Sequence, residues 1–186
     1  MFMLRGIVQI CQVTRDRDRS IASWIGLYGA GPFFVADFRL EGHHYRGRPV
    51  TADVSVGLAF CGSLLIELAQ PNGVGPSIYH EVLESRGEAV HHFWKPSADF
   101  DAETARYAAK GCPVIAGGPI PGMGRQAFVD STAETGAFTE ILELADWVYG
   151  ALDLMRQAHL CWDGSDPVRP YPAPGAGAPS TAAGGT

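Results

Sequence analysis

An internal repeat limits the possible folds of this chain more than any other feature of its sequence. The segments that contain Gln9 and His92 align at one constant offset. The same offset pairs Asp16 with Asp99, Asp18 with Asp101, and Trp24 with Tyr107. In each copy an aspartate follows a strand-like run and precedes roughly ten helix-like residues that lead to a glycine. Aspartate is a favoured helix N-cap and glycine a favoured C-cap, so each copy is predicted to begin with a strand and a helix.

Three strand-like runs follow each predicted helix. They lie at residues 32–40, 52–60 and 63–70 in the first half, and at residues 113–118, 125–131 and 137–144 in the second half. Each half therefore has the order strand, helix, strand, strand, strand. This predicts an α+β fold of two βαβββ modules, residues 5–70 and 89–144, joined by a short helix over residues 77–86.

The residues after the repeat are expected to form a helix at 145–160 and a flexible tail at 161–186. The apolar residues between Trp147 and Met155 have helical spacing, whereas the tail is rich in Pro, Gly and Ala and has little apolar bulk to offset its ordering entropy. An apolar helix beyond a closed core often packs on a second subunit, so a homodimer is expected. Packing on its own sheet is the alternative.

Composition argues against several classes of protein. The chain has 20 Asp and Glu residues against 14 Lys and Arg residues, a net charge of -6, which disfavours nucleic-acid binding. Its 4 cysteines are widely spaced, which favours reduced thiols over a disulfide framework or a zinc site. No apolar run has the length of a membrane helix, and the first residues do not have the pattern of a signal peptide. A cytoplasmic protein without a membrane or nucleic-acid partner is expected.

Four polar residues interrupt strand faces that are otherwise apolar. Gln9 and His92 lie in the first strand of each half, and Glu67 and Glu140 lie in the last. A lone glutamate usually faces solvent and a lone histidine is usually structural, but a carboxylate on an apolar face is costly unless it is paired or bound to a cation. If the halves are related by a pseudo-twofold axis, all four side chains converge. Their oxygen and nitrogen atoms suit a divalent metal ion.

The adjacent histidines of the stretch "VHHFW" are expected to point in opposite directions. Neighbouring residues of a strand face opposite sides of the sheet. His92 aligns with Gln9 and is predicted to face the site. His91 is predicted to have a structural or supporting role.

The segments "QICQVTRDRDRSIASW", "LLIELAQP", "GEAVHHFW" and "GAFTEILEL" carry a family resemblance over about residues 7–144. The chain resembles the vicinal oxygen chelate superfamily, which includes glyoxalases, epimerases, extradiol dioxygenases and antibiotic-resistance proteins, and is most similar to its epimerase-like glyoxalase branch. The resemblance implies a cupped mixed sheet whose metal ligands match Gln9, Glu67, His92 and Glu140. The epimerases have histidine at the position of Gln9. A set of Gln, Glu, His and Glu resembles that of some glyoxalase I enzymes.

The resemblance also implies the chemistry. A divalent ion such as Zn, Ni, Co, Mn or Mg would stabilise an enolate or enediolate, and Glu140 or Glu67 would act as the base. The chain would then be an isomerase or lyase for a small oxo-acid, an acyl-CoA or a hemithioacetal.

Substrate contacts are expected from a predicted hairpin connection and from the connecting helix. The candidates are His43, His44, Tyr45 and His80; a solvated loop is the alternative for the first three.

Two other functions remain open. A metal-free protein that binds and sequesters a small molecule is known among resistance-type members of the superfamily. An extradiol-type dioxygenase normally requires two histidines and one carboxylate at iron, and the inferred set contains one histidine.

Overall fold

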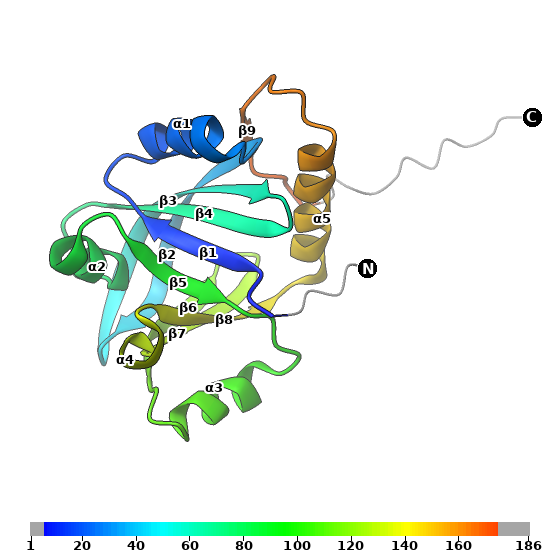
Figure 1. Cartoon of the computed structure of the whole chain (residues 1–186). Coiled ribbons are helices and arrows are strands. Elements are labelled where there is room, and N and C mark those ends of the chain that lie inside the picture. Colours follow the sequence, from blue (N-terminus) through cyan, green and yellow to red (C-terminus); the bar gives the residue numbers. More distant parts are fainter. Residues whose placement is uncertain (1–5, 175–186) are drawn as a thin grey trace, which may run out of the picture.

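Nine strands and five helices make up the part of the chain that the computed structural model describes, residues 6–174 (Figure 1). In chain order they are β1 (Gln9–Val13), α1 (Arg17–Tyr28), β2 (Phe33–Tyr45), β3 (Arg48–Cys61), β4 (Leu64–Asn72), α2 (Ile78–Arg86), β5 (Val90–Trp94), α3 (Phe100–Ala108), β6 (Val114–Ile120), β7 (Gly124–Val129), α4 (Thr132–Thr135), β8 (Phe138–Leu144), α5 (Asp146–Leu160) and β9 (Val168–Pro170).

Eight strands close into a ring in the order β3-β4-β1-β5-β8-β7-β6-β2, and pairing of β2 with β3 completes it. In each half the first strand pairs in parallel with the last, β1 with β4 and β5 with β8. The two first strands, β1 and β5, are antiparallel neighbours at the junction of the halves. The predicted α+β fold of two βαβββ modules is therefore confirmed.

The aspartates of the repeat cap the two equivalent helices. Asp16 begins α1 and Asp99 begins α3, and each carboxylate accepts a hydrogen bond from the backbone N–H three residues later, at 2.9 and 2.8 Å. Gly29 ends α1 with φ at 66°, in the left-handed region where glycine is favoured. Helix α3 ends instead at Ala109 in a right-handed conformation, and Gly111 (φ 82°) makes the turn that follows.

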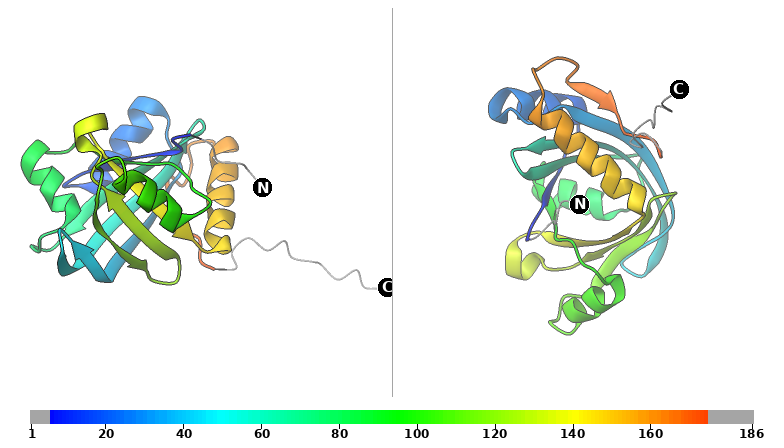
Figure 2. Two further views of the ribbon diagram at one scale, coloured as in Figure 1. Left: turned by 90° about the horizontal axis from the view of Figure 1, so that it is seen from below. Right: turned by 90° about the vertical axis from the view of Figure 1, so that its right-hand side faces the viewer.

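Two helices cover the ends of the ring. Helix α2 closes one end with Ile78, Tyr79, Val82 and Leu83, which are buried with side chains from inside the ring. Helix α5 lies across the other end, as the right-hand view of Figure 2 shows. The site described below lies between them.

Helix α5 packs on its own chain. Its residues Ala151 and Met155 are buried against Phe34, Phe60 and Leu65 of the sheet. Most of the apolar surface that suggested a homodimer is thus covered within the protomer, although Leu154 is exposed, and the dimer stays a prediction. Among the described residues, no helix combines the length and hydropathy of a membrane-spanning segment.

Part of the predicted tail is ordered sheet, which corrects the expectation for residues 161–186. Strand β9 pairs in parallel with β2, and the N–H of Tyr171 donates to the carbonyl of Val35 at 3.0 Å. The ring of Trp162 packs so closely on Gly31 that an added Cβ would lie 2.4 Å from it. The segment is ordered because β9 pairs with β2 and Trp162 packs on Gly31, and its composition did not predict either contact. Residues 175–186 of the predicted tail lie outside the described residues.

Candidate functional site

The structure brings together the four polar side chains that the sequence singled out. They come from four neighbouring strands of the ring: Glu67 on β4, Gln9 on β1, His92 on β5 and Glu140 on β8. The Nε2 atom of His92 lies 3.2 Å from a carboxylate oxygen of Glu140 and 3.4 Å from one of Glu67. The side-chain nitrogen of Gln9 lies 3.3 Å from the same Nε2 and donates a hydrogen bond to Glu67. We call these four residues the central cluster.

The central cluster faces a cavity of about 100 Å³ inside the ring, the inner cavity. Gln9, Glu67 and Glu140 line this cavity, while His92 is fully buried. Most of the remaining wall is apolar and includes Phe38, Leu40, Val54, Val56, Leu58, Leu65, Leu142 and Leu152. Polar atoms in a mostly apolar cavity are the usual composition of a small-molecule site.

The spacing of the cluster atoms fits one bound metal ion. Neighbouring ligand atoms at about 2.0–2.2 Å from an ion lie about 2.8–3.6 Å from one another in octahedral and tetrahedral arrangements. The carboxylate–imidazole distances of 3.2 and 3.4 Å fall in this range. Turning the amide of Gln9 by 180° exchanges its nitrogen and oxygen and presents an oxygen to the ion. Glu67, His92 and Glu140 form a group whose ligand atoms all lie within 4.8 Å of one another.

The electrostatics of the cluster favour a bound positive charge. Burial raises the pKa of Glu140, an effect that His92 partly offsets. Burial lowers the pKa of His92, but its interactions with Cys11 and Glu140, including a hydrogen bond to each, outweigh burial and raise this pKa well above its ordinary value. Both shifts mean that a proton is held strongly between Glu140 and His92, and a metal ion would supply the same positive charge.

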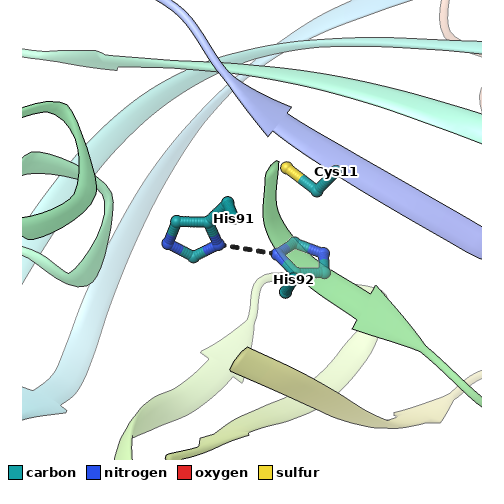
Figure 3. Close-up of side chains that lie close together, drawn as sticks. All are labelled: Cys11, His91 and His92. Carbon is teal, nitrogen blue, oxygen red and sulfur yellow. Dashed lines mark hydrogen bonds between the residues drawn. The ribbon is translucent and has the colours of Figure 1, made fainter. Parts of the chain in front are cut away.

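The two adjacent histidines do not point in opposite directions, contrary to the alternation rule. In the pairing of β1 with β5, Cys11 is opposite His92 while Gln12 is opposite Val90, so His91 is the extra residue of a β-bulge. The Nδ1 atoms of the two rings lie 2.8 Å apart (Figure 3). His91 also stacks on Tyr79, with ring centroids 4.7 Å apart. The bulge therefore turns His91 toward His92, and the contact between their Nδ1 atoms fixes the orientation of the His92 ring.

Cys11 is a neighbour of the cluster that sequence analysis missed. Its sulfur lies within 4.8 Å of ring nitrogens of both His91 and His92 (Figure 3). Burial raises the pKa of its thiol to about 12, so it is neutral at physiological pH. Its place on the same strand face as Gln9 was visible in the sequence, but a cysteine there is also an ordinary core residue.

Tyr171 is a second missed residue, and it comes from the segment predicted to be a tail. Its side chain lines the inner cavity, and its ring meets Trp147 of α5 edge to face at 6.5 Å. Burial and the charge of Glu67 raise the pKa of Tyr171 to about 12. No local pattern identified this residue, because it reaches the cavity only through the pairing of β9 with β2.

The predicted substrate-binding residues lie elsewhere. The Nε2 atom of His43 hydrogen-bonds to the carbonyl of Pro119 at 2.8 Å, and the hydroxyl of Tyr45 donates to Glu81 of α2. His44 is exposed, and His80 bonds through Nδ1 to Ser77, the N-cap of α2, at 2.9 Å. None of the four predicted residues is among the described residues that line the inner cavity. The structure does not bring them to the central cluster.

A closed ring of two βαβββ modules with a carboxylate, amide and imidazole cluster at its centre defines a protein of the vicinal oxygen chelate class. The family model described as the Glyoxalase/Bleomycin resistance protein/Dioxygenase superfamily matches residues 8–129, and the chain belongs to this superfamily. Among curated protein sequences none matches the chain significantly.

Solved structures share the fold at low sequence identity. The methylmalonyl-CoA epimerase of Mycobacterium tuberculosis is 18% identical, with a TM-score of 0.58 over 81% of this chain and 97% of the epimerase. The hypothetical protein BH1468 of Bacillus halodurans C-125 is 17% identical, with a TM-score of 0.54 over 74% of this chain and 93% of that protein.

Proposed function

We propose that this protein is a metal-dependent isomerase or lyase of the glyoxalase–epimerase type. The convergence of Gln9, Glu67, His92 and Glu140 on one apolar cavity carries the proposal. Two buried carboxylates around one imidazole are expensive in an apolar interior unless a cation joins them.

Glu67, His92, Glu140 and the turned amide of Gln9 would hold the ion. A bound divalent ion would supply positive charge that polarises a substrate carbonyl and stabilises the negative charge left when the adjacent carbon loses a proton. The apolar walls of the inner cavity would orient the substrate and exclude water from it.

Glu140 is the better candidate for the base that removes this proton. Its side chain is 6% exposed against 12% for Glu67, so Glu140 lies deeper in the apolar wall. Glu140 contacts His92 and lines the inner cavity. Because burial raises the pKa of Glu140, its carboxylate is more basic than an exposed one.

The substrate proposed is a small oxo-acid, an acyl-CoA or a hemithioacetal. All three have an acidic C–H next to a carbonyl or an equivalent oxygen-bearing carbon. The name of the similar M. tuberculosis protein, methylmalonyl-CoA epimerase, supports proton transfer next to a carbonyl as the type of reaction.

Metal analysis and proton exchange test this proposal. Protein purified without chelator is expected to contain close to one divalent ion per chain, and the His92→Ala variant is expected to contain none. Representatives of the three substrate classes are then incubated in D2O, and loss of the C–H signal is followed by NMR. A metal-free protein that binds a candidate without exchange would contradict the proposal and favour a sequestering role.

A further inference from the structure

A second cavity lies next to the inner cavity and is much larger. It has a volume of about 900 Å³ and runs between α5, the beginning of α3 and the residues that follow β5. We call it the outer groove; its wall includes Val8, Pro96, Phe100, Tyr149, Gly150 and Arg156. The proposed chemistry of the central cluster does not use this space.

The outer groove and the inner cavity share part of their walls. Five side chains line both: Leu65, Trp94, Leu142, Leu144 and Leu152. All five are apolar, and Trp94 lies between Gln9 and Glu140 in the register of the sheet. A molecule that occupies both cavities must therefore be apolar where it passes these side chains.

The charges along the outer groove disfavour an anionic ligand. Among its described wall residues three are acidic, Glu143, Asp146 and Asp153, and one is basic, Arg156. Arg156 itself lies 3.8 Å from Asp153, and Arg125 pairs with Glu143. A long anionic group such as the phosphates of coenzyme A would meet net negative charge here.

We propose that the outer groove binds the uncharged, apolar body of the substrate, whose oxygen-bearing head reaches the central cluster. This inference rests on the proposed function and narrows its substrate class. It favours an elongated, neutral carbonyl compound over a coenzyme A thioester.

Hydroxamates test whether the head of the substrate binds at the central cluster and its apolar body in the outer groove. Their two oxygens chelate a metal, and the length and charge of their chains can be varied. The protein loaded with Co(II) is titrated with acetohydroxamate, octanohydroxamate and the monohydroxamate of suberic acid, which ends in a carboxylate. Binding is followed by the visible absorption of cobalt. Octanohydroxamate is expected to bind at least tenfold more tightly than acetohydroxamate, and the terminal carboxylate is expected to remove this gain. Equal affinity for the first two, or retention of the gain by the third, would overturn the proposal.

Two glycines provide a matched pair of variants. Gly150 on α5 lines the outer groove and Gly26 on α1 does not; both are helical and exposed, and an added Cβ meets no atom within 4 Å at either. Gly150→Phe is expected to abolish the gain for octanohydroxamate, whereas Gly26→Phe is expected to keep it. If Gly150→Phe does not fold, Gly150→Leu replaces it. A gain that survives a folded Gly150 variant contradicts the proposal.

Calorimetry on the metal-free protein separates this inference from the proposed function. Octanohydroxamate is expected to bind the metal-free wild type weakly and the Gly150→Phe variant not at all. If cobalt does not bind, or its absorption does not respond to any hydroxamate, the proposed metal site is refuted. Calorimetry on the metal-free protein still shows whether the outer groove binds an apolar chain. Absence of octanohydroxamate binding in calorimetry would overturn the groove even if the metal site were sound.

Discussion

The Nδ1 atoms of His91 and His92 lie 2.8 Å apart, although the two residues are neighbours in one strand. Burial lowers the pKa of His91 well below its ordinary value, which keeps this ring neutral and able to accept a hydrogen bond. If the Nδ1–H of His92 donates to His91, the Nε2 atom of His92 faces Glu67 and Glu140. It holds a proton there in the absence of a metal ion and would offer a lone pair to a bound ion. The pair thus has the arrangement of a metal ligand held in its tautomer by a second residue.

The two histidines are expected to differ in their effect on metal affinity. His92→Ala should abolish metal binding, because it removes the ligand atom. His91→Phe retains a ring beside Tyr79 but removes the Nδ1 contact, and should weaken binding about 10- to 100-fold. Competition with a coloured chelator measures both affinities. Loss of metal from His91→Phe with full retention by His92→Ala would reverse the assignment.

The Glu140→Gln variant distinguishes the role of Glu140 as the base from its role as a metal ligand. The variant keeps the shape of the side chain and an oxygen that can bind metal, but cannot take up the substrate proton. We expect proton exchange to fall by about 10²- to 10⁴-fold while part of the metal remains bound. Glu67→Gln is the comparison, and should reduce metal content more than it reduces exchange per bound metal. Exchange at the wild-type rate in Glu140→Gln would exclude Glu140 as the base.

Tyr171 is expected to stabilise the fold through its packing on α5. Tyr171→Ala removes a largely buried ring and should lower the free energy of unfolding by about 1–3 kcal/mol. Val168→Ala, at a side chain in β9 that is 49% exposed, is the control and should change it by less than about 0.5 kcal/mol. Urea denaturation measures both. Equal effects would show that the ring of Tyr171 is not part of the core.

Glu81 is expected to contribute a pH-dependent part of the stability. Hydrogen bonds from Arg46, at 2.7 and 2.9 Å, hold the pKa of Glu81 below its ordinary value of 4.5. A lowered pKa stabilises the folded protein above the unfolded-state value, and the contribution is lost as pH falls through the folded-state value. Because both side chains are partly exposed, Glu81→Gln should cost about 0.5–1 kcal/mol at pH 7.

The difference between wild type and Glu81→Gln should shrink below about pH 4.5 and vanish at lower pH. Urea denaturation across the acid range measures it. Glu84→Gln, at an exposed position of the same helix, should change stability by less than about 0.5 kcal/mol at every pH. A difference that stayed constant from pH 7 to pH 3 would show that the Arg46 pair does not carry it.

The residues of the central cluster were predictable because each half of the repeat has its own local signals. Asp16 and Asp99 are helix caps, and each bonds to a backbone group only three residues away. Strand alternation shows which apolar residues lie on the same strand face as Gln9, and which lie on the same face as Glu140. The positions of His43 and Tyr45 were not predictable. Their hydrogen-bond partners Pro119 and Glu81, which hold them away from the central cluster, are far away in the chain.

The sequence by itself determined the two modules and the four polar side chains that interrupt their apolar strands, since strand period and helix caps depend on near neighbours. Only the tertiary structure decided that His91 turns toward His92, because a β-bulge exists only in relation to the partner strand β1. It likewise decided that Tyr171 enters the inner cavity, because a segment of low apolar content gained its order from an edge of β2. Unpaired backbone groups of a strand edge can order a segment whose own composition predicts none.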